Sequence, residues 1–276
     1  MTNQLPLIIN ARQLEQELQN SKQNILLVDM SSAANYIQHH IKSAVFLDYS
    51  WIVRVEPPRM GLLPNEKQLD TVLNGLGLTS DTHVIAYDDE GGGRACRLLW
   101  TLETVGHQKY SLLDGGIQHW LANNLPVTDK ISYPTPCETE QQNHYSIIET
   151  PVANQSFILT HIDDPQVVIL DARSPAEYTG QKAFAERAGH IPKAINWDWM
   201  EAMDKNNNLC LKPQQELSTT LDNLGITKDK LVITHCQTHH RSAHTYIVLK
   251  SLGYDKIKGY PGSWSDWGNT ANTPVV

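Results

Sequence analysis

The sequence lacks the features that would indicate a membrane, secreted or nucleic-acid-binding protein. It contains no apolar run close to the roughly 20 residues that a membrane-spanning helix needs. Its first residues, MTNQLPLIINARQ, do not show the basic-then-apolar pattern of a signal peptide, so a cytoplasmic protein is expected. Its net charge of −8 opposes general binding to nucleic acid or acidic lipid. We therefore expect neither nucleic acids nor membranes as partners.

Cysteine is also scarce. The four cysteines, Cys96, Cys137, Cys210 and Cys236, are scattered without any Cys-x-x-Cys pair. This spacing is neither a disulfide framework nor a standard zinc finger. In a reducing compartment all four are thiols, and any of them is either a nucleophile or a small core residue.

What the sequence does contain is a repeat. The matching segments, in the same order in both halves, are NILLVDM (24–30) with QVVILDA (166–172), HIKSAVFLDYSW (40–51) with HIPKAINWDWME (190–201), LDTVLNGLGLTSDTHVIAYD (69–88) with LSTTLDNLGITKDKLVITHC (217–236), and LLDGGIQHW (112–120) with GYPGSWSDW (259–267). Four ordered matches predict two homologous domains, at residues 1–130 and 154–276. Residues 131–153 are polar, contain three prolines and match nothing in the repeat, so they are expected to be a linker.

Each copy alternates short apolar runs, such as ILLVD, HVIAY, VVILD and LVITH, with segments in which leucine recurs at helical spacing. Strands that are apolar along their whole length, alternating with helices, predict a parallel sheet covered on both faces. The expected fold class is therefore α/β, with two doubly wound parallel-sheet domains. Functional loops of such sheets lie at the carboxyl ends of the strands.

The segment VITHCQTHHRSAHTYIVL (232–249) places one cysteine at such a strand end, directly before an expected helix that begins near Arg241 or Ser242. A helix N-terminus and a nearby cation both lower the pKa of a thiol, which favours the nucleophilic thiolate. Between Lys230 and Tyr254 the acidic protein has no Asp or Glu, but it has Arg241 and four histidines. The sequence thus predicts an activated nucleophile at Cys236.

The loop after Cys236 also predicts the size of the bound group. Phosphatases with a cysteine nucleophile place five residues between Cys and Arg, whereas only four separate Cys236 from Arg241. Successive backbone N–H groups around Cys236 would form a nest for an anion, and a shorter loop would fit a single sulfur atom better than phosphate. The first copy has the longer spacing but carries Asp88 in the nucleophile position, so we expect it to be catalytically silent.

With these motifs in view, residues 24–120 and 166–267 both resemble rhodanese domains. The resemblance is carried by LDARSPAEY (170–178), GHIPKAIN (189–196), HCQTHHRS (235–242) and GYPGSWSDW (259–267), and it covers nearly the whole chain. The full sequence is similar to the tandem-domain thiosulfate sulfurtransferases of bacteria. This resemblance implies an enzyme without a cofactor that transfers sulfane sulfur from thiosulfate to cyanide or to a cellular thiol or protein.

The resemblance implies a two-step cycle in which the Cys236 thiolate takes the outer sulfur of thiosulfate, releases sulfite and carries a persulfide. The positive potential and fixed donors would come from the backbone N–H groups of five residues, Gln237, Thr238, His239, His240 and Arg241. The Arg241 side chain is expected either to steer thiosulfate or to tie the loop down. Four further residues are expected to support the loop from behind: Asp171, Arg173, Glu177 and Ser242.

Two positions depart from the animal rhodaneses. Thr238 replaces a cationic residue, and Glu177 replaces an arginine, so the sulfonate contacts of those side chains do not transfer to this chain. His190 is expected to be structural, because its repeat partner His40 lies in the silent copy. Trp199, Trp264 and Trp267 are expected to lie mainly in the core, and Arg187 belongs to an insertion from which it could reach the site.

Several alternatives stay open at this point. A zinc site would use Cys236, His240 and His244, which are spaced by four, with His235 or His239 as further ligands. A phosphatase would use the same cysteine loop, and a mercaptopyruvate sulfurtransferase would use another donor. A non-catalytic sulfur carrier would hold the same persulfide for a partner.

Overall fold

The computed structural model describes residues 5–20, 24–138 and 142–276, which form two compact units. Unit 1 comprises Met1–Ile52, Pro64–Ile147 and Asp204–Leu211, and unit 2 comprises Val53–Leu63, Ile148–Met203 and Lys212–Val276. Residues 1–4 and 21–23 of the expected first domain, and residues 139–141 of the expected linker, lie outside the described residues.

Unit 1 is built on a five-stranded parallel sheet in the order β1-β8-β7-β2-β4. Its strands are β1 (Ile8–Ile9), β2 (Ile25–Asp29), β4 (Val45–Phe46), β7 (His83–Tyr87) and β8 (Tyr110–Leu113). Neighbouring side chains of a strand point to opposite faces of the sheet. Because helices cover both faces here, β7 is buried along its whole length. Ile85 and Tyr87 pack against helices α1 (Ala11–Asn20) and α5 (Gly116–Ala122), while α4 (Gly93–Thr104) packs against β7 and β8.

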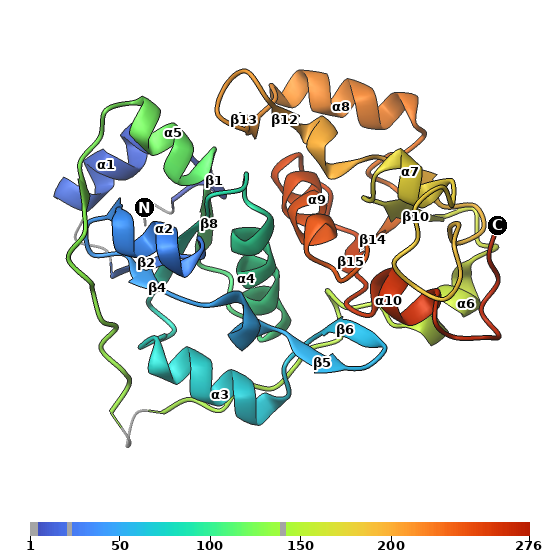
Figure 1. The fold of residues 1–276 in the computed structure, drawn as a ribbon, viewed down its shortest axis with the longest axis horizontal. Coiled ribbons are helices and arrows are strands. Elements are labelled where there is room, and N and C mark those ends of the chain that lie inside the picture. Colours follow the sequence, from blue (N-terminus) through green and yellow to red (C-terminus); the bar gives the residue numbers. More distant parts are fainter. Residues whose placement is uncertain (1–4, 21–23, 139–141) are drawn as a thin grey trace. The chain divides into compact units, whose positions relative to one another are not determined.

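Unit 2 repeats this arrangement with a four-stranded parallel sheet in the order β11-β10-β14-β15. The strands are β10 (Val167–Asp171), β11 (Ile195–Asn196), β14 (Leu231–His235) and β15 (Ile257–Gly259). Helices α6 (Gln155–His161) and α10 (Ser263–Trp267) contribute to the core on one side, and α9 (Arg241–Ser251) packs against β14 and β15 (Figure 1). Two α/β units with central parallel sheets confirm the predicted fold class.

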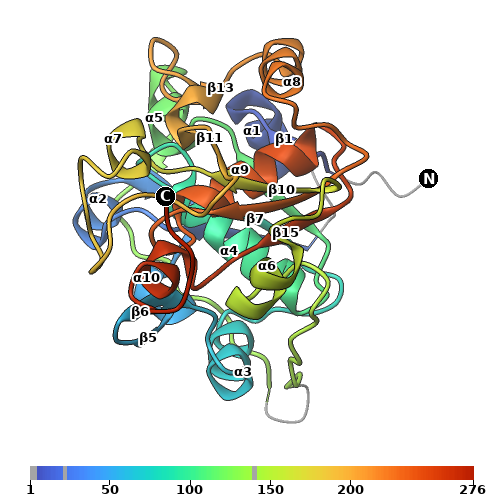
Figure 2. The same cartoon turned by 90° about the vertical axis from the view of Figure 1, so that its right-hand side faces the viewer.

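The remaining elements are short. Unit 1 also has α2 (Ala33–Gln38), η1 (Tyr49–Ile52), α3 (Glu66–Gly75) and the antiparallel pair β3 (His40–Ile41) and β9 (Val127–Thr128). Unit 2 also has α7 (Pro175–Tyr178), η3 (Trp199–Ala202) and α8 (Gln214–Asn223), whose Leu217 and Leu221 are buried as the leucine spacing predicts. Figure 2 shows α9, β10 and β15 from a second direction. In the described part of the chain, no helix is long and apolar enough to cross a membrane.

In each repeat a short hairpin follows the 3-10 helix. Residues of each hairpin belong to the unit that is built mainly from the other repeat. The antiparallel hairpin β5 (Arg54–Glu56) and β6 (Arg59–Leu62) belongs to unit 2, where β6 packs against α10. In the second repeat, β12 (Met203–Asp204) and β13 (Cys210–Leu211) pair, and Asp204–Leu211 belongs to unit 1. There the Leu211 N–H donates to Asp114 Oδ1 at 2.8 Å.

The repeat is also visible in equivalent side chains. His190 Nδ1 lies 2.9 Å from the carbonyl oxygen of Tyr178, and its ring stacks on the Tyr178 ring with centroids 3.7 Å apart. His40 makes the same two contacts with Tyr36, at 2.7 Å and 3.9 Å. Both histidines therefore fix a turn after a short helix, in agreement with the structural role expected for His190.

Candidate functional site

Cys236 follows the last residue of β14 and lies in the loop that leads into α9. It is a free thiol and only 1% exposed. Its N–H donates to Ser263 Oγ at 3.3 Å, and its carbonyl oxygen accepts from the Trp264 N–H at 2.9 Å. The next carbonyl oxygen, of Gln237, accepts from the Ser265 N–H at 3.0 Å. The first turn of α10 thus fixes the start of the loop.

The thiol of Cys236 is surrounded by groups that stabilise its ionised form. Burial raises the pKa of the thiol, but the Arg241 guanidinium, the side chain and N–H of Ser242 and the N–H of Thr238 all lower it, and together they outweigh burial. The net result is a pKa below the ordinary value of a thiol. This is the electrostatic signature of a nucleophilic cysteine rather than of an inert core residue.

The Arg241 side chain forms a two-pronged ion pair with Glu177 of α7. Nη1 donates to Oε2 at 2.6 Å and Nη2 donates to Oε1 at 2.8 Å. Ser174, which caps α7, donates its hydroxyl to the same Oε2 at 2.8 Å. Burial of Glu177 opposes ionisation, but Arg241 and Ser174 lower the pKa of its carboxyl to about 2. Of the two roles expected for the Arg241 side chain, the ion pair corresponds to tying the loop down.

The middle of the loop is held by unusual backbone and by a close approach. His239 is completely buried and has a left-handed φ of 55°, and its Nδ1 lies 2.7 Å from Ser242 Oγ. The backbone of Thr238 lies against Gly61 of β6, where any β-carbon would run into the Thr238 carbonyl group. Gly61 carries no sequence signal that connects it to this loop, because the two lie far apart in the chain.

Asp171 and Arg173 form a buried ion pair behind the loop. Arg173 Nε lies 3.0 Å from both carboxylate oxygens and Nη2 lies 2.6 Å from Oδ2. Arg173 also donates to the Gly189 carbonyl oxygen at 2.9 Å and lies over the Trp264 ring, 4.3 Å from its centroid. Since Trp264 donates to the Cys236 carbonyl oxygen, the pair supports the residue that fixes the loop.

The other residues singled out from the sequence make contacts of different kinds. Arg187 donates to the carbonyl oxygens of Trp267 and Thr273, at 2.6 Å each, so its guanidinium holds the C-terminal segment. Trp264 and Trp267 are core residues, as expected. Trp199 is only partly buried, and its ring lies 5.9 Å from the His240 ring at the start of α9.

Unit 1 contains the equivalent loop, and there an anion already occupies it. Asp88 is fully buried, and its Oδ1 accepts from the N–H groups of Glu90 at 3.0 Å and Gly92 at 2.8 Å. Its Oδ2 accepts from the N–H groups of Arg94 at 2.9 Å and Ala95 at 3.0 Å. Four converging amide donors make this loop an anion nest.

The two loops are more alike in size than the spacing of the arginines suggests. Asp88 and Cys236 each directly follow the last residue of a strand. In both units the helix begins five residues later, at Gly93 after Asp88 and at Arg241 after Cys236. In both, the N–H groups of the second and sixth residues donate to that side chain. These equivalent positions do not favour a tighter ring in unit 2 than in unit 1, and the two loops differ in their side chains.

The zinc alternative has no geometric support in the described part of the chain. Among residues 5–20, 24–138 and 142–276, no group of three or more His, Cys, Asp or Glu side chains is placed to hold a metal ion. His244 is buried in α9, and the edge of its ring meets Trp199 with centroids 5.4 Å apart. Burial lowers the pKa of His244 to about 3, so this imidazole is neutral.

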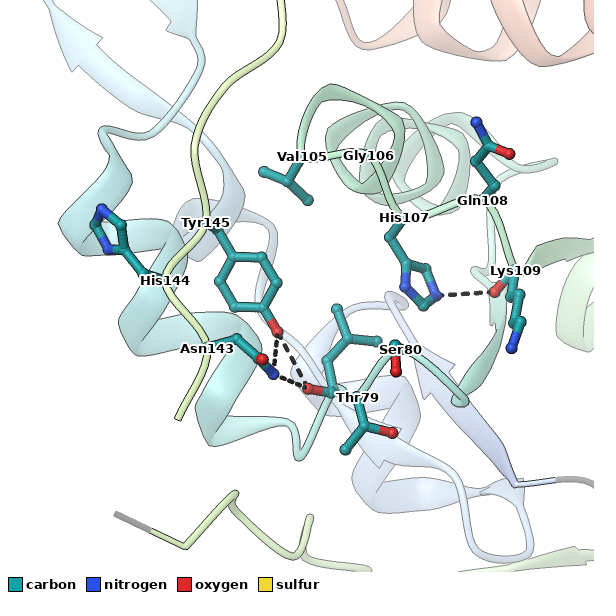
Figure 3. A pocket seen from close by; sticks show the side chains of 11 residues that line it. Thr79, Ser80, Val105, Gly106, His107, Gln108, Lys109, Asn143, His144 and Tyr145 are labelled. Carbon is teal, nitrogen blue, oxygen red and sulfur yellow. Dashed lines mark hydrogen bonds between the residues drawn. The ribbon is translucent and has the colours of Figure 1, made fainter. Parts of the chain in front are cut away.

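A cavity of about 410 Å³ lies elsewhere in unit 1, between the segments after α3 and α4 and residues 143–145 (Figure 3). The Tyr145 hydroxyl donates to the Leu78 carbonyl oxygen at 3.1 Å, and the Asn143 amide donates to the same oxygen at 3.2 Å. His107 Nε2 lies 3.1 Å from the Lys109 carbonyl oxygen. The residues that line this cavity include none of the predicted site residues.

Comparison with known families agrees with the repeat and with the loop. The model of the rhodanese-like domain matches the chain twice, at residues 10–123 and 155–270. The chain belongs to the rhodanese family. Both matches together cover most of the sequence, and the second includes the Cys236 loop.

Relatives of this rhodanese are similar over their whole length. It is 41% identical to the thiosulfate sulfurtransferase of Azotobacter vinelandii over 271 residues, which cover 98% of this chain and 97% of the relative. It is 40% identical to the thiosulfate sulfurtransferase of Pseudomonas aeruginosa over the same shares. It is also 31% identical to the sulfur carrier protein TtuD of Thermus thermophilus, over 98% of this chain and 96% of the relative.

Solved structures of lower sequence identity show the same fold. The crystal structure of YnjE superposes with a TM-score of 0.87 at 19% identity, over 98% of this chain and 68% of that one. The wild-type structure of EanB gives the same TM-score at 16% identity. The predicted family and enzyme class, a sulfurtransferase, are confirmed by the family match and the full-length relatives.

Proposed function

We propose that this sulfurtransferase moves the outer sulfur of thiosulfate to a thiophilic acceptor through a persulfide on Cys236. The observation that carries the proposal is a buried thiol whose pKa is lowered by Arg241, Ser242 and the N–H of Thr238 against the effect of burial. The thiosulfate sulfurtransferases that are 40% and 41% identical to this chain support thiosulfate as the donor.

In the first step, the Cys236 thiolate attacks the outer sulfur of thiosulfate. A new S–S bond forms at Cys236, the S–S bond of thiosulfate breaks, and sulfite leaves with the electron pair. In the second step, the acceptor attacks the outer sulfur of the persulfide and Cys236 leaves as thiolate. Because both leaving groups are stable anions, the site chiefly needs fixed donors and positive potential.

We assign these donors to the backbone N–H groups of the loop residues Gln237, Thr238, His239, His240 and Arg241. Ser242, Glu177, Asp171 and Arg173 would keep the loop in place. Thr238 and Glu177 provide no cation for the sulfonate of the donor, so amide groups would take over that role. We also propose that the first repeat, with Asp88 in the nest, is catalytically silent, and that residues 131–153 link domains at 1–130 and 154–276.

Intact-mass measurement tests the proposal directly. Thiosulfate should add one sulfur atom, about 32 Da, to the wild-type protein, and cyanide should remove it. Cys236→Ala should not gain this mass. Cys210→Ala is the matched control, because burial raises the pKa of the Cys210 thiol to about 12 and leaves it unreactive. The proposal would be contradicted if thiosulfate added no mass to the wild-type protein, or if Cys236→Ala gained the same mass as the wild type.

A second candidate function is a sulfur carrier that holds the persulfide for a protein partner. The relative named sulfur carrier protein TtuD, 31% identical over nearly the full length, favours it. Both functions form the same persulfide and differ in the second step. Multiple turnovers with thiosulfate and cyanide favour the enzyme, whereas a persulfide that is stable to cyanide and to small thiols favours the carrier.

A further inference from the structure

The hydroxyl of Ser242 lies between two groups that can exchange a proton. On one side, Ser242 Oγ is 2.7 Å from Nδ1 of His239. On the other side, the same side chain is hydrogen-bonded to the thiol of Cys236. His239 and Ser242 are both completely buried and Cys236 is 1% exposed, so bulk water does not separate the three groups.

A serine hydroxyl has one proton and can accept at its oxygen, so these two contacts are coupled. If the hydroxyl donates to His239, the oxygen accepts the proton of the Cys236 thiol. If the hydroxyl donates to a Cys236 thiolate, the oxygen accepts from a protonated Nδ1 of His239. The hydrogen bonds are satisfied in both arrangements, and they differ by the transfer of one proton.

The backbone holds the three groups in this arrangement. The left-handed φ of 55° at His239 is rare for a residue with a β-carbon, and it places the imidazole on the same side of the loop as Ser242. The residue before it, Thr238, lies against the backbone of Gly61. Ser242 is in the first turn of α9, where its N–H also donates to the thiol.

We propose that Ser242 and His239 form a proton relay that deprotonates Cys236, a proposal that rests on the function proposed above. The thiol proton passes to Ser242 Oγ while the hydroxyl proton passes to His239 Nδ1, which leaves a thiolate and an imidazolium. The S–H bond breaks, an N–H bond forms and no oxidant is needed. When Cys236 leaves as thiolate at the end of the cycle, the reverse transfer restores the thiol. Ser242 touches the reacting sulfur, and His239 is a positioning residue that acts through it.

Other ionisable groups lie around the relay, and none of the substitutions proposed to test it changes them. They come from the elements packed around the loop, and they are Asp171 and Arg173 after β10, Glu177 of α7, Glu201 of η3, His235 of β14, His240, Arg241 and His244 at α9, Asp266 of α10, and Arg54, Glu56 and Arg59 of the β5–β6 hairpin. Arg241 is paired with Glu177, and both hairpin arginines are paired with Glu56.

The relay predicts how the reactivity of Cys236 depends on pH. The test measures the rate constant for alkylation of Cys236 by iodoacetamide, between about pH 5 and about pH 9, from the mass of its peptide. In the wild type, coupling between thiol and imidazole should give two inflections. His239→Asn keeps a residue that tolerates left-handed backbone but cannot hold the proton. It should leave one inflection, at a higher pH, with about tenfold slower alkylation near pH 7.

Three further variants separate a relay from a structural effect. Ser242→Ala keeps the N–H donor and should give the same profile as His239→Asn, and the double variant should be no slower than either, because both changes break one relay. Ser242→Thr keeps the hydroxyl and should restore most of the reactivity. His161→Asn, which removes a histidine of α6, should leave the wild-type profile unchanged.

A His239→Asn profile that matches the wild type would overturn the relay, as would additive effects in the double variant. If His239→Asn does not fold, an unchanged profile in Ser242→Ala gives the same negative answer. Thiosulfate loading near pH 9 keeps the two proposals distinct. Loading in every variant with unchanged pH profiles refutes the relay alone, and no loading in the wild type refutes the sulfurtransferase function proposed for Cys236.

Discussion

Replacing Glu177 by glutamine tests how the loop is anchored. The substitution keeps the size of the side chain but removes the charge that pairs with Arg241. Glu177 is 3% exposed, so its carboxylate is separated from water and depends on Arg241 and Ser174 for its solvation. We therefore expect Glu177→Gln to destabilise unit 2.

The pKa of Glu177 sets the size and the pH range of the effect. Its pKa is about 2 in the folded unit and 4.5 in an unfolded chain, so the charge stabilises the fold above about pH 4.5 and this gain is lost as the pH falls through about 2. The difference corresponds to roughly 3 kcal/mol, at about 1.4 kcal/mol per factor of ten. Because the Arg241 side chain is 21% exposed and partly screened, we expect about 2 kcal/mol at neutral pH.

Urea unfolding followed by tryptophan fluorescence measures this difference. Four of the seven tryptophans, Trp197, Trp199, Trp264 and Trp267, lie in unit 2 and report its transition. The experiment compares wild type and Glu177→Gln at several values between about pH 7 and about pH 3, and less than half of the difference should remain at the lower end. Glu216→Gln is the control, because the exposed Lys212–Glu216 pair of α8 should contribute less than about 0.5 kcal/mol.

Two results would refute this reasoning. A difference that stays constant over the whole pH range would mean that the glutamine acts through packing rather than through the lost charge. A variant as stable as the wild type at neutral pH would mean that the Arg241 pair only balances the cost of burying Glu177.

Two further substitutions test the loops of the two units. Gly61→Ala would place a β-carbon against the Thr238 carbonyl and should slow persulfide formation about 10–100-fold in stopped-flow assays. Gly75→Ala, which points into open space in α3, should not, and equal rates for both would contradict the contact. Burial and the nearby Glu90 raise the pKa of Asp88 to about 6, so its charge opposes folding at neutral pH. This offsets the N–H donors that Asp88→Asn would leave facing an amide group, and the free energy of unfolding of unit 1 should therefore change by less than about 1 kcal/mol. Urea unfolding measures this, and sulfur loading of Cys236 that falls with Asp88→Asn would argue against a silent first repeat.

The central strands and helices could be predicted because their sequences carry a strong period. Runs such as VVILD and LVITH are apolar throughout and became β10 and β14 of a parallel sheet. The hairpin β5–β6 could not be placed in the same way. Its strands have three and four residues with mixed burial, so no hydrophobic period indicates which core they cover. Its position in unit 2 depends on tertiary contacts of β6 with α10.

The site was predictable where the chemistry is local in sequence. Cys236, the absence of acidic residues around it and the start of α9 are all visible in one segment, and the structure places them together. The partner of Arg241 was not predictable, because Glu177 lies 64 residues away and meets it only when α7 packs beside α9. The contact of Gly61 with Thr238 depends in the same way on the folded hairpin.

The two loops show which side chains make one fold suitable for an anionic donor. In unit 1, the anion in the nest is the carboxylate of Asp88, which is covalently fixed and has no sulfur to carry. The next two residues, Asp89 and Glu90, pair with Arg94, so a second anion would meet three carboxylates and one cation that is already neutralised. In unit 2 the corresponding residues are Cys236 and the uncharged Gln237 and Thr238. Since two of the amide donors lie at equivalent positions, three side chains rather than the backbone would account for the activity proposed for one loop and the silence proposed for the other.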